Sequence, residues 1–521
     1  MLNNSMSDTI IIGSRGSDLA LWQANYVQSQ LKSLGFNSRI KIIKTRGDKI
    51  QHLSFDKLEG KGFFTKEIED ALIRKEIDLA VHSHKDLETN PPKGLVIAAV
   101  SEREDPSELL LIRKEAVDSS KFWGLKENAI VGTSSSRRKS QILLFRDDVQ
   151  LKDLRGNVPT RVQKLRDGNY DAILLAKAGV IRLNLDISDL HVECLPKKWF
   201  IPAPAQGVLA LQIREDDLII QEILDRLNSL STQEEINVER KVLNLFNGGC
   251  QLPLGVYCEK DSTSTKIWVS ILKPNESYPL RLYKENMSPE LLVQLLNSKI
   301  GENKKVFISR DLNHGSLFKK NLINQNISVF GKSLIKITFN EISDLPNTDW
   351  IFFNSSNSVE SLKKHVDYLK TKKIAVFGKA TNMSIKKMGL NSAFIGEGSP
   401  TEIADSFAKV LLNEKVLFPV SNRSLKTIQS KIPLENQVEV ISYATSNTEE
   451  EIKGYELLVF TSPSNVNAYL SFNNVNFNQK VVAIGPSTKA ALVKAGFKEI
   501  YSSWESSELA LSDTVMSVFY N

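Results

Sequence analysis

Ten residues show how the first part of this chain folds: Ala129-Ile130-Val131-Gly132-Thr133-Ser134-Ser135-Ser136-Arg137-Arg138. The apolar, β-branched start predicts a buried strand, and the hydroxyls that follow predict a turn leading into a helix. Hydroxyls and free N–H groups at a helix N-terminus, with arginines beside them, are typical of a carboxylate or phosphate site. The stretch therefore predicts a strand, a polar turn and a helix, with anion-binding groups where the strand ends.

The same alternation extends to both sides of this stretch. Short apolar runs predict further strands at residues 9–12, 78–81 and 172–176. One helical face is predicted by the spacing of Leu19, Trp22, Tyr26, Val27 and Leu31. Such alternation favours an α/β architecture with mostly parallel sheets, whose ligands bind beyond the carboxyl ends of the strands.

Arginine occurs in four of the polar turns. These are Ser14-Arg15-Gly16-Ser17, Thr133-Ser134-Ser135-Ser136-Arg137-Arg138, Leu154-Arg155-Gly156-Asn157 and Thr160-Arg161. Any one of them is more often a capped helix with a solvated arginine, but four together favour a pocket for a polycarboxylate. The absence of Gly-x-x-x-x-Gly-Lys-Ser/Thr from the sequence argues against a nucleotide P-loop.

The positive charge of the chain is concentrated in one place. The formal net charge is +6, and residues 137–166 hold nine Lys/Arg against three Asp, so 9 − 3 accounts for the whole excess. These basic residues lie in separate predicted loops without interleaved aromatic residues, unlike a single-strand nucleic-acid binder. We therefore expect a small polyanionic ligand and no nucleic acid.

Length and composition predict a multi-domain protein of the cytoplasm. The chain has 521 residues, of which 41% are hydrophobic and 25% charged, and no apolar run approaches the roughly 18 residues of a membrane helix. Residues 1–8 lack the basic-then-apolar order of a secretion signal. Three scattered cysteines fit a reducing compartment. We expect no membrane partner and interpret the chain as a monomer, although the sequence does not decide the oligomeric state.

A carboxylate stands at the tip of another predicted strand, in Leu79-Ala80-Val81-His82-Ser83-His84-Lys85-Asp86. Asp86 beside Lys85 is either a plain surface pair or a carboxylate inside a basic pocket, where it would bind N–H groups and stabilise developing cations. His82 and His84 have no third ligand in view, so we interpret them as structural and predict no metal site.

One cysteine has an unusual setting, Asn247-Gly248-Gly249-Cys250-Gln251-Leu252-Pro253-Leu254-Gly255. Two glycines allow the backbone to bend and bring the thiol close to another surface. Cys194 and Cys258 lack such a setting, and we expect both to be inert and buried. Cys250 is the candidate for covalent chemistry.

A boundary near residues 300–305 precedes an internal repeat. Ser298-Lys299-Ile300-Gly301-Glu302-Asn303-Lys304-Lys305 is polar, and a fresh strand is predicted directly after it. Beyond it, Ser355-Ser356-Asn357-Ser358-Val359 recurs 107 positions later as Ser462-Pro463-Ser464-Asn465-Val466, with Gly378/Gly485, Thr381/Thr488 and Gly389/Gly496 in the same register. Two similar α/β lobes with a cleft between them are expected.

Taken together, the motifs of the first part resemble hydroxymethylbilane synthase, also called porphobilinogen deaminase. The resemblance adds Gly60-Lys61-Gly62-Phe63-Phe64, Pro202-Ala203-Pro204-Ala205-Gln206-Gly207 and Gly248-Gly249-Cys250-Gln251 to the turns above, in family order from residue 8 to about 300. His84 departs mildly from the family, in which a larger apolar residue is commoner at this position.

This resemblance implies both a mechanism and a set of site residues. Cys250 would carry a dipyrromethane cofactor through a thioether, and Asp86 would hold pyrrole nitrogens and assist proton transfers while four porphobilinogen units are joined with loss of ammonia. The acetate and propionate groups of cofactor and substrate would be bound by a larger set. The residues that would bind the cofactor are Ser83, Lys85, Arg137, Arg138, Arg155 and Gly156. Those that would bind the substrate are Arg15, Gln23, Lys61, Phe63, Arg161, Arg182 and Gln206.

The implied fold is similar to that of periplasmic binding proteins. Two α/β lobes, about 8–105 with 207–225 and about 106–206, would precede a small α/β domain that presents the cysteine, about 226–302, within a unit spanning 8–302.

The second part, residues 304–521, resembles uroporphyrinogen-III synthase. The match rests on the two serine-rich turns, on Ile484-Gly485-Pro486-Ser487-Thr488 and on Tyr443-Ala444-Thr445. It implies one lobe of about 304–336 with 446–521, a second of about 337–442 inserted into it, and linker strands near 335–339 and 440–445.

Such an enzyme would remove the terminal hydroxyl of hydroxymethylbilane, invert the last ring and close the macrocycle to uroporphyrinogen III. Without it the linear intermediate closes to the type I isomer. Tyr443 would be the acid, and Ser462, Ser464, Ser487 and Thr488 would bind substrate carboxylates.

Each half also has an alternative interpretation. The first could be a non-enzymatic receptor for an anionic ligand, although a receptor does not need a glycine-flanked cysteine. The second could be an inactive scaffold or regulatory lobe pair, because little obligatory side-chain chemistry is visible there. The sequence does not decide whether the intermediate is channelled or which downstream product is made.

Overall fold

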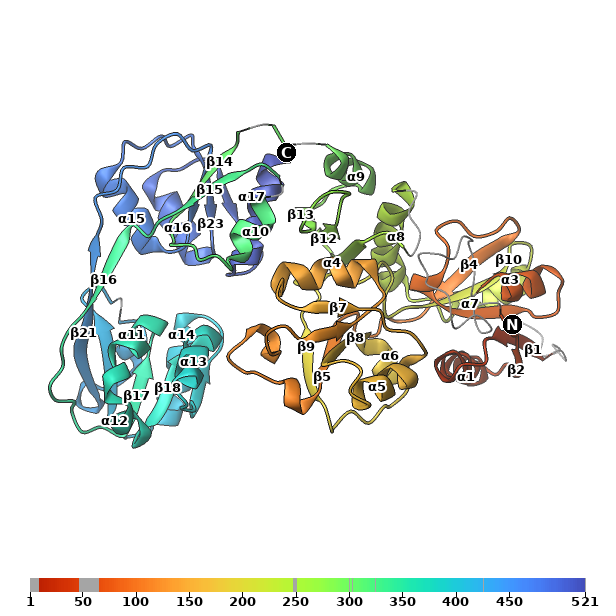
Figure 1. Ribbon diagram of the computed structural model, residues 1–521, viewed down its shortest axis with the longest axis horizontal. Coiled ribbons are helices and arrows are strands. Elements are labelled where there is room, and N and C mark those ends of the chain that lie inside the picture. The colour runs from red at the N-terminus through yellow and green to blue at the C-terminus, as the bar shows by residue number, and fades with distance from the viewer. Residues whose placement is uncertain are drawn as a thin grey trace.

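The structure is a computed structural model that describes residues 9–45, 65–246, 251–298, 300–301, 303–323, 325–424 and 426–520. The described strands form five sheets. In Figure 1 the first half of the chain lies in the middle and at the right, and the second half lies at the left. Within the described residues, no helix is long and apolar enough to cross a membrane.

The first lobe is a five-stranded sheet of order β2-β1-β3-β10-β4. Its elements are β1 (Ile10–Ser14), α1 (Asp18–Ser33), β2 (Ser38–Ile42), α3 (Lys66–Ile73), β3 (Leu79–Ser83), the 3-10 turn η2 (His84–Asp86), β4 (Leu95–Val100), β10 (Leu209–Arg214) and α7 (Leu218–Asp225). Helix α1 begins at Ser17, whose side chain accepts a hydrogen bond from the Ala20 N–H. Its buried face is shifted from the predicted one, because Gln23 and Ala24 are buried where Trp22 and Tyr26 were expected.

The second lobe is a five-stranded sheet of order β7-β6-β8-β5-β9. Its elements are β5 (Glu108–Ile112), η3 (Lys114–Ala116), η4 (Phe122–Gly124), β6 (Ile130–Gly132), α4 (Ser136–Phe145), β7 (Gln150–Lys152), α5 (Val158–Arg166), β8 (Ala172–Ala176), α6 (Lys177–Arg182) and β9 (His191–Leu195). Ser135 and Asn157 cap α4 and α5, so the hydroxyl and amide of the predicted turns do begin helices.

Two chain crossings join these lobes, from β4 to β5 and from β9 back to β10. In each sheet the strand next to a crossing, β10 or β5, runs antiparallel to its neighbours, while the other pairings in that part of the sheet are parallel. Gly207 lies in the second crossing with φ +90°, and a Cβ there would come within 2.2 Å of the Glu104 carbonyl oxygen. The crossings therefore pass too close together for any residue but glycine at this position.

A small domain follows the second crossing. Helix α8 (Leu230–Leu245), the antiparallel strands β11 (Leu254–Lys260), β12 (Thr265–Ile271) and β13 (Leu280–Glu285), and α9 (Pro289–Asn297) form it. Helix α8 packs on β11 and α9. The glycine loop that contains Cys250 leads from α8 to β11, and residues 247–250 lie outside the described part of the chain.

The first lobe of the second half is a sheet of order β15-β14-β22-β23-β24. Its elements are β14 (Lys305–Ile308), α10 (Leu317–Ile323), β15 (Ser328–Gly331), β22 (Leu457–Phe460), α15 (Pro463–Phe472), β23 (Lys480–Ala483), α16 (Pro486–Ala495), β24 (Ile500–Ser502) and α17 (Glu508–Phe519). All its strand pairings are parallel.

The second lobe of this half is a six-stranded sheet of order β16-β21-β20-β17-β18-β19. Its elements are β16 (Ile335–Phe339), β17 (Trp350–Phe353), α11 (Ser356–Ser361), η5 (Lys363–His365), α12 (Val366–Lys370), β18 (Lys373–Phe377), α13 (Gly378–Lys387), β19 (Phe394–Gly396), α14 (Pro400–Leu411), β20 (Val416–Ser421), η6 (Gln429–Lys431), η7 (Leu434–Asn436) and β21 (Gln437–Asn447). The antiparallel pair β16 and β21 is the predicted two-stranded linker, and it runs between the lobes in Figure 1.

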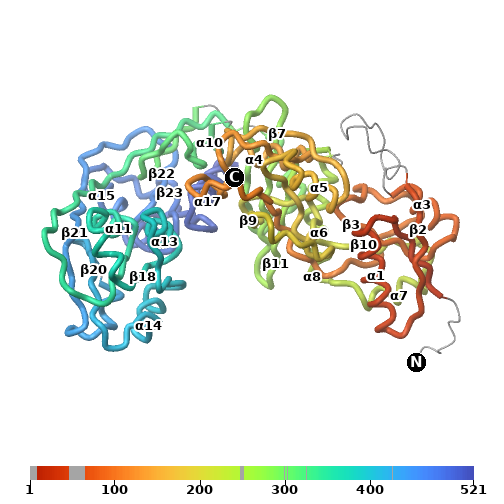
Figure 2. Tube along the Cα trace, turned by 60° about the horizontal axis from the view of Figure 1, so that its bottom comes forward, coloured from red at the N-terminus to blue at the C-terminus, as the bar shows by residue number. Residues whose placement is uncertain are grey.

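The internal repeat is confirmed. Ser355 caps α11 after β17, and Ser462 caps α15 after β22, with β17 and β22 beginning 107 positions apart at Trp350 and Leu457. The predicted fold class, two α/β lobes with a small α/β domain followed by a second two-lobed α/β unit, is also confirmed. Figure 2 shows that the two halves meet where α10 and α17 lie against the first half.

Candidate active sites

The polar turns of the second lobe are tied to one another. The Ser134 hydroxyl donates a hydrogen bond to the Leu154 carbonyl (2.9 Å) and accepts one from the Leu154 N–H (3.0 Å). This places the turn before α4 beside the turn before α5, at the carboxyl ends of the parallel strands β6 and β7. Two of the four predicted basic turns therefore form one surface.

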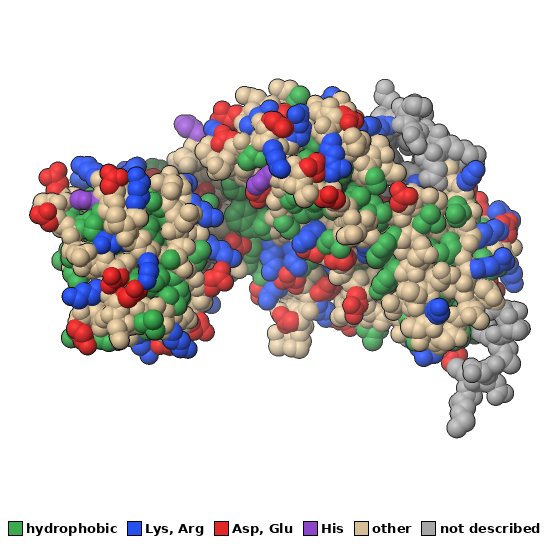
Figure 3. Space-filling view, turned by 90° about the horizontal axis from the view of Figure 1, so that it is seen from below, with side chains coloured by type: hydrophobic (Ala, Val, Ile, Leu, Met, Phe, Trp, Pro, Cys, Tyr) green, Lys and Arg blue, Asp and Glu red, His purple; other side chains and the backbone are tan. Residues whose placement is uncertain are grey.

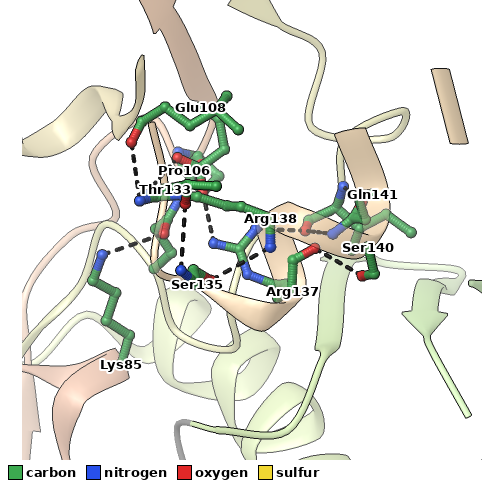
Figure 4. A network of polar contacts seen from close by, with 12 residues as sticks. Lys85, Pro106, Glu108, Thr133, Ser135, Arg137, Arg138, Ser140 and Gln141 are labelled. Atoms are coloured by element: carbon green, nitrogen blue, oxygen red, sulfur yellow. Dashed lines mark hydrogen bonds and ion pairs between the residues drawn. The ribbon is translucent and has the colours of Figure 1, made fainter. Parts of the chain in front are cut away.

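A buried carboxylate holds two of the predicted arginines. Glu108 accepts from Arg137 through one oxygen and from Arg138 through the other, each at 2.7 Å (Figure 4). Burial alone would raise the pKa of Glu108, but the two guanidinium groups hold it at about 2. Both arginines are thereby fixed in position, and Arg138 also donates to the Leu174 carbonyl at 3.1 Å.

Gln206 links this pair to the first lobe across the crossings. Its amide nitrogen donates to Glu108 at 3.1 Å and to the Pro106 carbonyl at 2.7 Å, and its carbonyl accepts from Lys85 Nζ at 3.3 Å. Burial lowers the pKa of Lys85, while the neighbouring Asp86 opposes that shift. Lys85 and Gln206 thus bring η2 of the first lobe to the arginines of the second.

Asp86 is exposed at the tip of β3, in η2, as the sequence predicts. Its charge acts on Arg161, whose pKa is lowered to about 10 by burial and by Arg138, with Asp86 opposing the shift. Lys85 feels the same group of charges, from Asp86, Arg138 and Arg137. The carboxylate therefore lies in a strongly basic environment while remaining open to solvent.

The other predicted residues of the first lobe surround η2. Gln23 of α1 is buried and donates to the Ser83 hydroxyl at 2.8 Å. Arg15 is partly exposed, and its charge acts on His82. His82 and His84 are buried, and burial lowers their pKa to about 4 and about 3, so both are neutral at pH 7.

Arg182 occupies a different place from the other arginines. It donates to the Gly207 carbonyl at 2.5 Å, and its guanidinium lies 5.6 Å from the ring centre of Trp22. These contacts join α6 of the second lobe to α1 and the crossing segment.

The cluster around Asp86 has an excess of positive charge. Four cations and two carboxylates act on one another, which gives 4 − 2 = +2: Lys85, Arg137, Arg138 and Arg161, with Asp86 and Glu108. In the described part of the chain, Arg161 and Arg155 have no ion-pair partner, and Arg138 Nε has no hydrogen-bond partner although it is buried. Buried donors without acceptors are costly unless a ligand satisfies them. A ligand with several carboxylates would supply acceptors for these donors.

The cysteines fall into three different settings. Cys250, like Lys61 and Phe63, lies outside the described residues. Cys258 is buried in β11, and burial raises the pKa of its thiol to about 12, as expected of an inert cysteine. The expectation that Cys194 is buried is wrong: it is exposed on β9, an edge strand of its sheet, where alternate side chains face solvent.

In the second half, Tyr443 lies on the linker strand β21 and reaches the second lobe. Its hydroxyl is 3.3 Å from that of Ser355, the cap of α11, and the side chain is 9% exposed. Ser462 caps α15, and Ser464 lies in the first turn of the same helix. Ser487 and Thr488 lie in the first turn of α16, Thr488 buried and Ser487 exposed. Helices α15 and α16 pack side by side, so these four residues lie at one end of the lobe.

Sequence reasoning missed the acidic partners of the arginines. Glu108 is one, and Glu239 of α8 is another: it binds Arg103 through both oxygens (2.7 and 3.1 Å) and accepts from the Ala205 N–H at 2.7 Å. A carboxylate opening the apolar run Glu108-Leu109-Leu110-Leu111-Ile112 was the available signal, because an unpaired charge is not expected there.

The fold and the sites define a class: two α/β units in one chain, each with two lobes, the first with a cluster of net positive charge where its lobes meet. Residues 10–222 match the family model of the porphobilinogen deaminase dipyrromethane cofactor-binding domain, and residues 318–511 match that of uroporphyrinogen-III synthase HemD. The chain is 39% identical to porphobilinogen deaminase of Nitratiruptor sp. over 306 residues, 58% of this chain and 96% of the relative. With the enzyme of Helicobacter hepaticus the identity is 42% over 273 residues, 52% and 83% of the two chains.

The chain therefore belongs to the porphobilinogen deaminase family, and it carries a uroporphyrinogen-III synthase domain in its second half. Among solved structures, it is similar to uroporphyrinogen-III synthetase from Helicobacter pylori, at 15% identity and a TM-score of 0.34, over 42% of this chain and all of that one. It is also similar to a periplasmic binding protein from Salmonella typhimurium, at 11% identity and a TM-score of 0.26, over 44% of this chain and 97% of that one.

The two family matches indicate the two activities. The chain is a bifunctional enzyme of tetrapyrrole biosynthesis: a transferase that makes hydroxymethylbilane from porphobilinogen, and a cyclising lyase that makes uroporphyrinogen III. Its first unit uses a dipyrromethane cofactor. The described residues fit that group, because a dipyrromethane built from substrate carries several carboxylates, and Arg138 Nε is a buried donor without an acceptor in the described part of the chain.

Proposed function

We propose that Asp86 is the catalytic carboxylate of the deaminase unit, and that the cluster of cations around it binds the carboxylates of cofactor and substrate. The supporting observation is the single exposed carboxylate in a cluster of net charge 4 − 2 = +2 that includes the buried Arg138. Lys85, Arg137, Arg138, Arg155 and Arg161 hold the acetate and propionate groups, and Ser83 and Gln23 complete the first-lobe wall.

Cys250 carries the dipyrromethane. When bound, this group supplies the pyrrole carbon to which the first porphobilinogen is joined. The glycines at 248 and 249 support the assignment, as does the setting of the other two cysteines. Cys258 is buried with a raised pKa, and Cys194 lies on β9, on the far side of β5 from β6 and β7, the strands that end in the basic turns.

Asp86 acts on the substrate in two ways. Its carboxylate accepts a hydrogen bond from the pyrrole N–H, which orients the ring. When the carbon–nitrogen bond of the aminomethyl group breaks, ammonia leaves with the electron pair and positive charge develops on the ring. A carboxylate held at a fixed position stabilises that charge without having to reorganise.

In the synthase unit, Tyr443 is the acid. Its phenol donates a proton to the terminal hydroxyl of hydroxymethylbilane as the carbon–oxygen bond breaks, so that water leaves. Ser355, 3.3 Å away, orients the phenol, and the buried position of Tyr443 limits competition from solvent. Ser462, Ser464, Ser487 and Thr488, in the first turns or caps of α15 and α16, bind substrate carboxylates.

Several further expectations accompany this assignment. We propose a reducing compartment, the cytoplasm, for which the two free thiols Cys194 and Cys258 are the support. We also propose that the chain divides into units at residues 8–302 and 304–521, with the lobes described above. Each sheet draws its strands from one of these segments.

The decisive experiment is to supply porphobilinogen to the purified protein and identify the uroporphyrinogen isomer that forms. Type III product supports both assignments. Type I product alone would mean that the second unit is an inactive scaffold or regulatory lobe pair, and consumption without tetrapyrrole would mean that the first assignment is wrong.

Intact-mass analysis tests the cofactor attachment separately. The protein is expected to carry an adduct of two pyrrole units that is lost in Cys250→Ser and retained in Cys194→Ser. An active protein without an adduct, or an adduct retained in Cys250→Ser, would contradict the assignment.

A further inference from the structure

We infer that the two enzymes are held together by a specific docking interface, in which α17 of the synthase packs on β13 of the small domain around the ion pair Arg281–Asp513. The partner of this surface is the other half of the same chain. The two halves are expected to stay bound to each other after the polar join at residues 298–305 is cut.

The ion pair at the centre is completely buried. Arg281 of β13 is 0% exposed and Asp513 of α17 is 1% exposed, and Nε and Nη2 of the arginine each lie 3.1 Å from a carboxylate oxygen. A charge pair removed from water requires good geometry and satisfied remaining donors. Here both conditions hold, because Nη1 donates to the Trp199 carbonyl (2.7 Å) and Nη2 to the Lys198 carbonyl (2.8 Å).

Three parts of the chain therefore meet at one guanidinium. Arg281 belongs to the small domain, residues 198–199 follow β9 of the deaminase second lobe, and Asp513 belongs to the synthase. Asp513 accepts a further hydrogen bond from Asn321 of α10, at 3.2 Å. Because removing either charge leaves the other buried and uncompensated, the pair fixes one register of α17 on β13.

An apolar core continues through the interface. One cluster of buried residues takes members from the small domain and from the synthase, including Val256, Leu282, Leu296, Phe318, Val515 and Val518. Beside it, the ring of Trp504 packs edge-on against Trp268, with centroids 5.8 Å apart. A shared core of this kind is typical of a permanent interface, because it leaves apolar surface on both sides if the halves separate.

Polar contacts extend the interface to its rim. Lys320 of α10 pairs with Asp147, after α4, at 2.7 Å, and Lys284 of β13 donates to the Ser517 carbonyl at 2.8 Å. The Trp199 indole donates to Glu505 at 3.1 Å. Every one of these synthase residues belongs to its first lobe, at α10, α17 or the loop before α17.

The second synthase lobe takes no part. In the described part of the chain, no hydrogen bond or ion pair joins residues 340–440 to the deaminase, and Figure 3 shows the two halves touching at one end with an open hollow below. The interface therefore anchors one synthase lobe and leaves the other connected through β16 and β21. It also braces the small domain against the deaminase second lobe, through the contacts of Arg281 with residues 198 and 199.

Cutting the folded chain tests the proposal. A protease site inserted after Gly301 is cleaved in the purified full-length protein, which is then diluted to about 1 μM and run on a sizing column. The cleaved protein is expected to elute as one species near the 58.4 kDa of the intact chain. Elution as two separate halves would overturn the proposal.

Substitution of the ion pair shows whether these residues hold the halves together. Arg281→Met is expected to weaken binding between the cleaved halves by at least a hundredfold, and Arg281→Met combined with Asp513→Leu should recover most of it, because no unpaired charge is then buried. The matched control is Arg166→Met, which removes an arginine paired with Asp189 on the exposed surface and should leave binding unchanged.

A second variant covers the case in which Arg281→Met does not fold. Trp504→Ala removes a ring from the edge of the interface and leaves the ion pair intact, so the variant is expected to fold. Its cleaved halves should bind each other more weakly and therefore separate at a higher protein concentration than the wild-type halves. Halves of Trp504→Ala and of Arg281→Met that hold together as tightly as wild type would overturn the proposal. Isomer analysis of the uncut protein is a separate measurement, so failure of the proposed active sites would be recognised independently.

Discussion

Glu108 Oε2 lies 2.7 Å from Nη2 of Arg138, and both side chains are buried where the two lobes of the deaminase meet. The other oxygen of Glu108 binds Arg137 at the same distance. The two arginines that we propose as ligand-binding residues are thus held by a carboxylate of the protein itself. They do not have to be ordered when a ligand arrives, which lowers the entropic cost of binding it.

Replacing this carboxylate should destabilise the deaminase severely. Glu108→Gln keeps the shape of the side chain but leaves two buried guanidinium groups without a counter-charge. We expect the free energy of unfolding to fall by about 3–5 kcal/mol, as when one partner of a buried pair is removed. Urea denaturation at pH 7 measures the change.

Glu115→Gln is the matched control, because that carboxylate is 74% exposed and pairs with Arg113 at the surface. It should change stability by less than about 1 kcal/mol. Equal effects of the two substitutions would contradict the role given to Glu108.

The sequence predicted the elements of this site better than their partners. Strand, hydroxyl turn and helix are local patterns, so the turns at 133–138 and 154–157 could be placed, and parallel strands bring their carboxyl ends together. Glu108 escaped because its contact with Arg137 and Arg138 depends on β5 entering the sheet antiparallel to β8, with Glu108 opposite Ala176. No local pattern specifies that register.

The same limit applies between the halves. Arg281 and Asp513 are separated by 232 positions, and each lies in a segment whose local pattern predicts only a strand or a helix. The polar stretch at 298–305 predicted only a boundary between two units, whereas the structure also contains an interface between them, which no local pattern specifies. Cys194 was misplaced for a related reason, since the edge position of β9 is a property of the whole sheet.

Two buried histidines should make the deaminase sensitive to acid. The pKa values of His82 and His84, about 4 and about 3, lie below the ordinary value of 6.5, because burial disfavours the charged form. Between pH 6.5 and about 4 the unfolded chain binds protons that the folded protein does not. Stability is therefore complete above pH 6.5 and lost as the pH falls, by about 2 kcal/mol per histidine between pH 7 and pH 5.

His84→Leu tests this dependence. The His84 Nδ1 atom has no hydrogen-bond partner among the described residues, so leucine should be tolerated at pH 7. Urea denaturation gives the free energy of unfolding of the deaminase at pH 7 and at pH 5. In His84→Leu this free energy should fall by about 2 kcal/mol less between the two pH values than in the wild type. An unchanged pH dependence would show that His84 is not the titrating group.

Asp86→Asn separates chemistry from binding in the deaminase. The substitution keeps the shape of the side chain and removes the negative charge, and Asp86 is exposed, so the fold should be unaffected. We expect porphobilinogen consumption to fall by about a hundredfold or more, because the developing positive charge loses its fixed counter-charge.

Glu88→Gln, two residues along the chain, removes a carboxylate that we place outside the site and should leave turnover within a factor of about two. Circular dichroism and the thermal midpoint confirm that both variants fold. Near-normal turnover in Asp86→Asn would refute its assignment.

The last prediction concerns Tyr443, whose hydroxyl lies 3.3 Å from that of Ser355. Tyr443→Phe removes the proton donor and little volume, so both lobes of the synthase should keep their structure. Hydroxymethylbilane would still be made at the normal rate, because the deaminase is untouched, but without assisted loss of its hydroxyl it would leave the synthase and close unaided. The product should therefore shift from type III toward type I uroporphyrinogen while porphobilinogen consumption stays constant, as chromatography of the oxidised porphyrins would show.

Ser355→Ala should give a smaller shift, since it removes an orienting contact and not the acid. Tyr501→Phe, on β24 of the other lobe, is the control and should change neither rate nor isomer. Continued formation of type III product by Tyr443→Phe would assign the proton to another group and leave Tyr443 a packing residue of the linker.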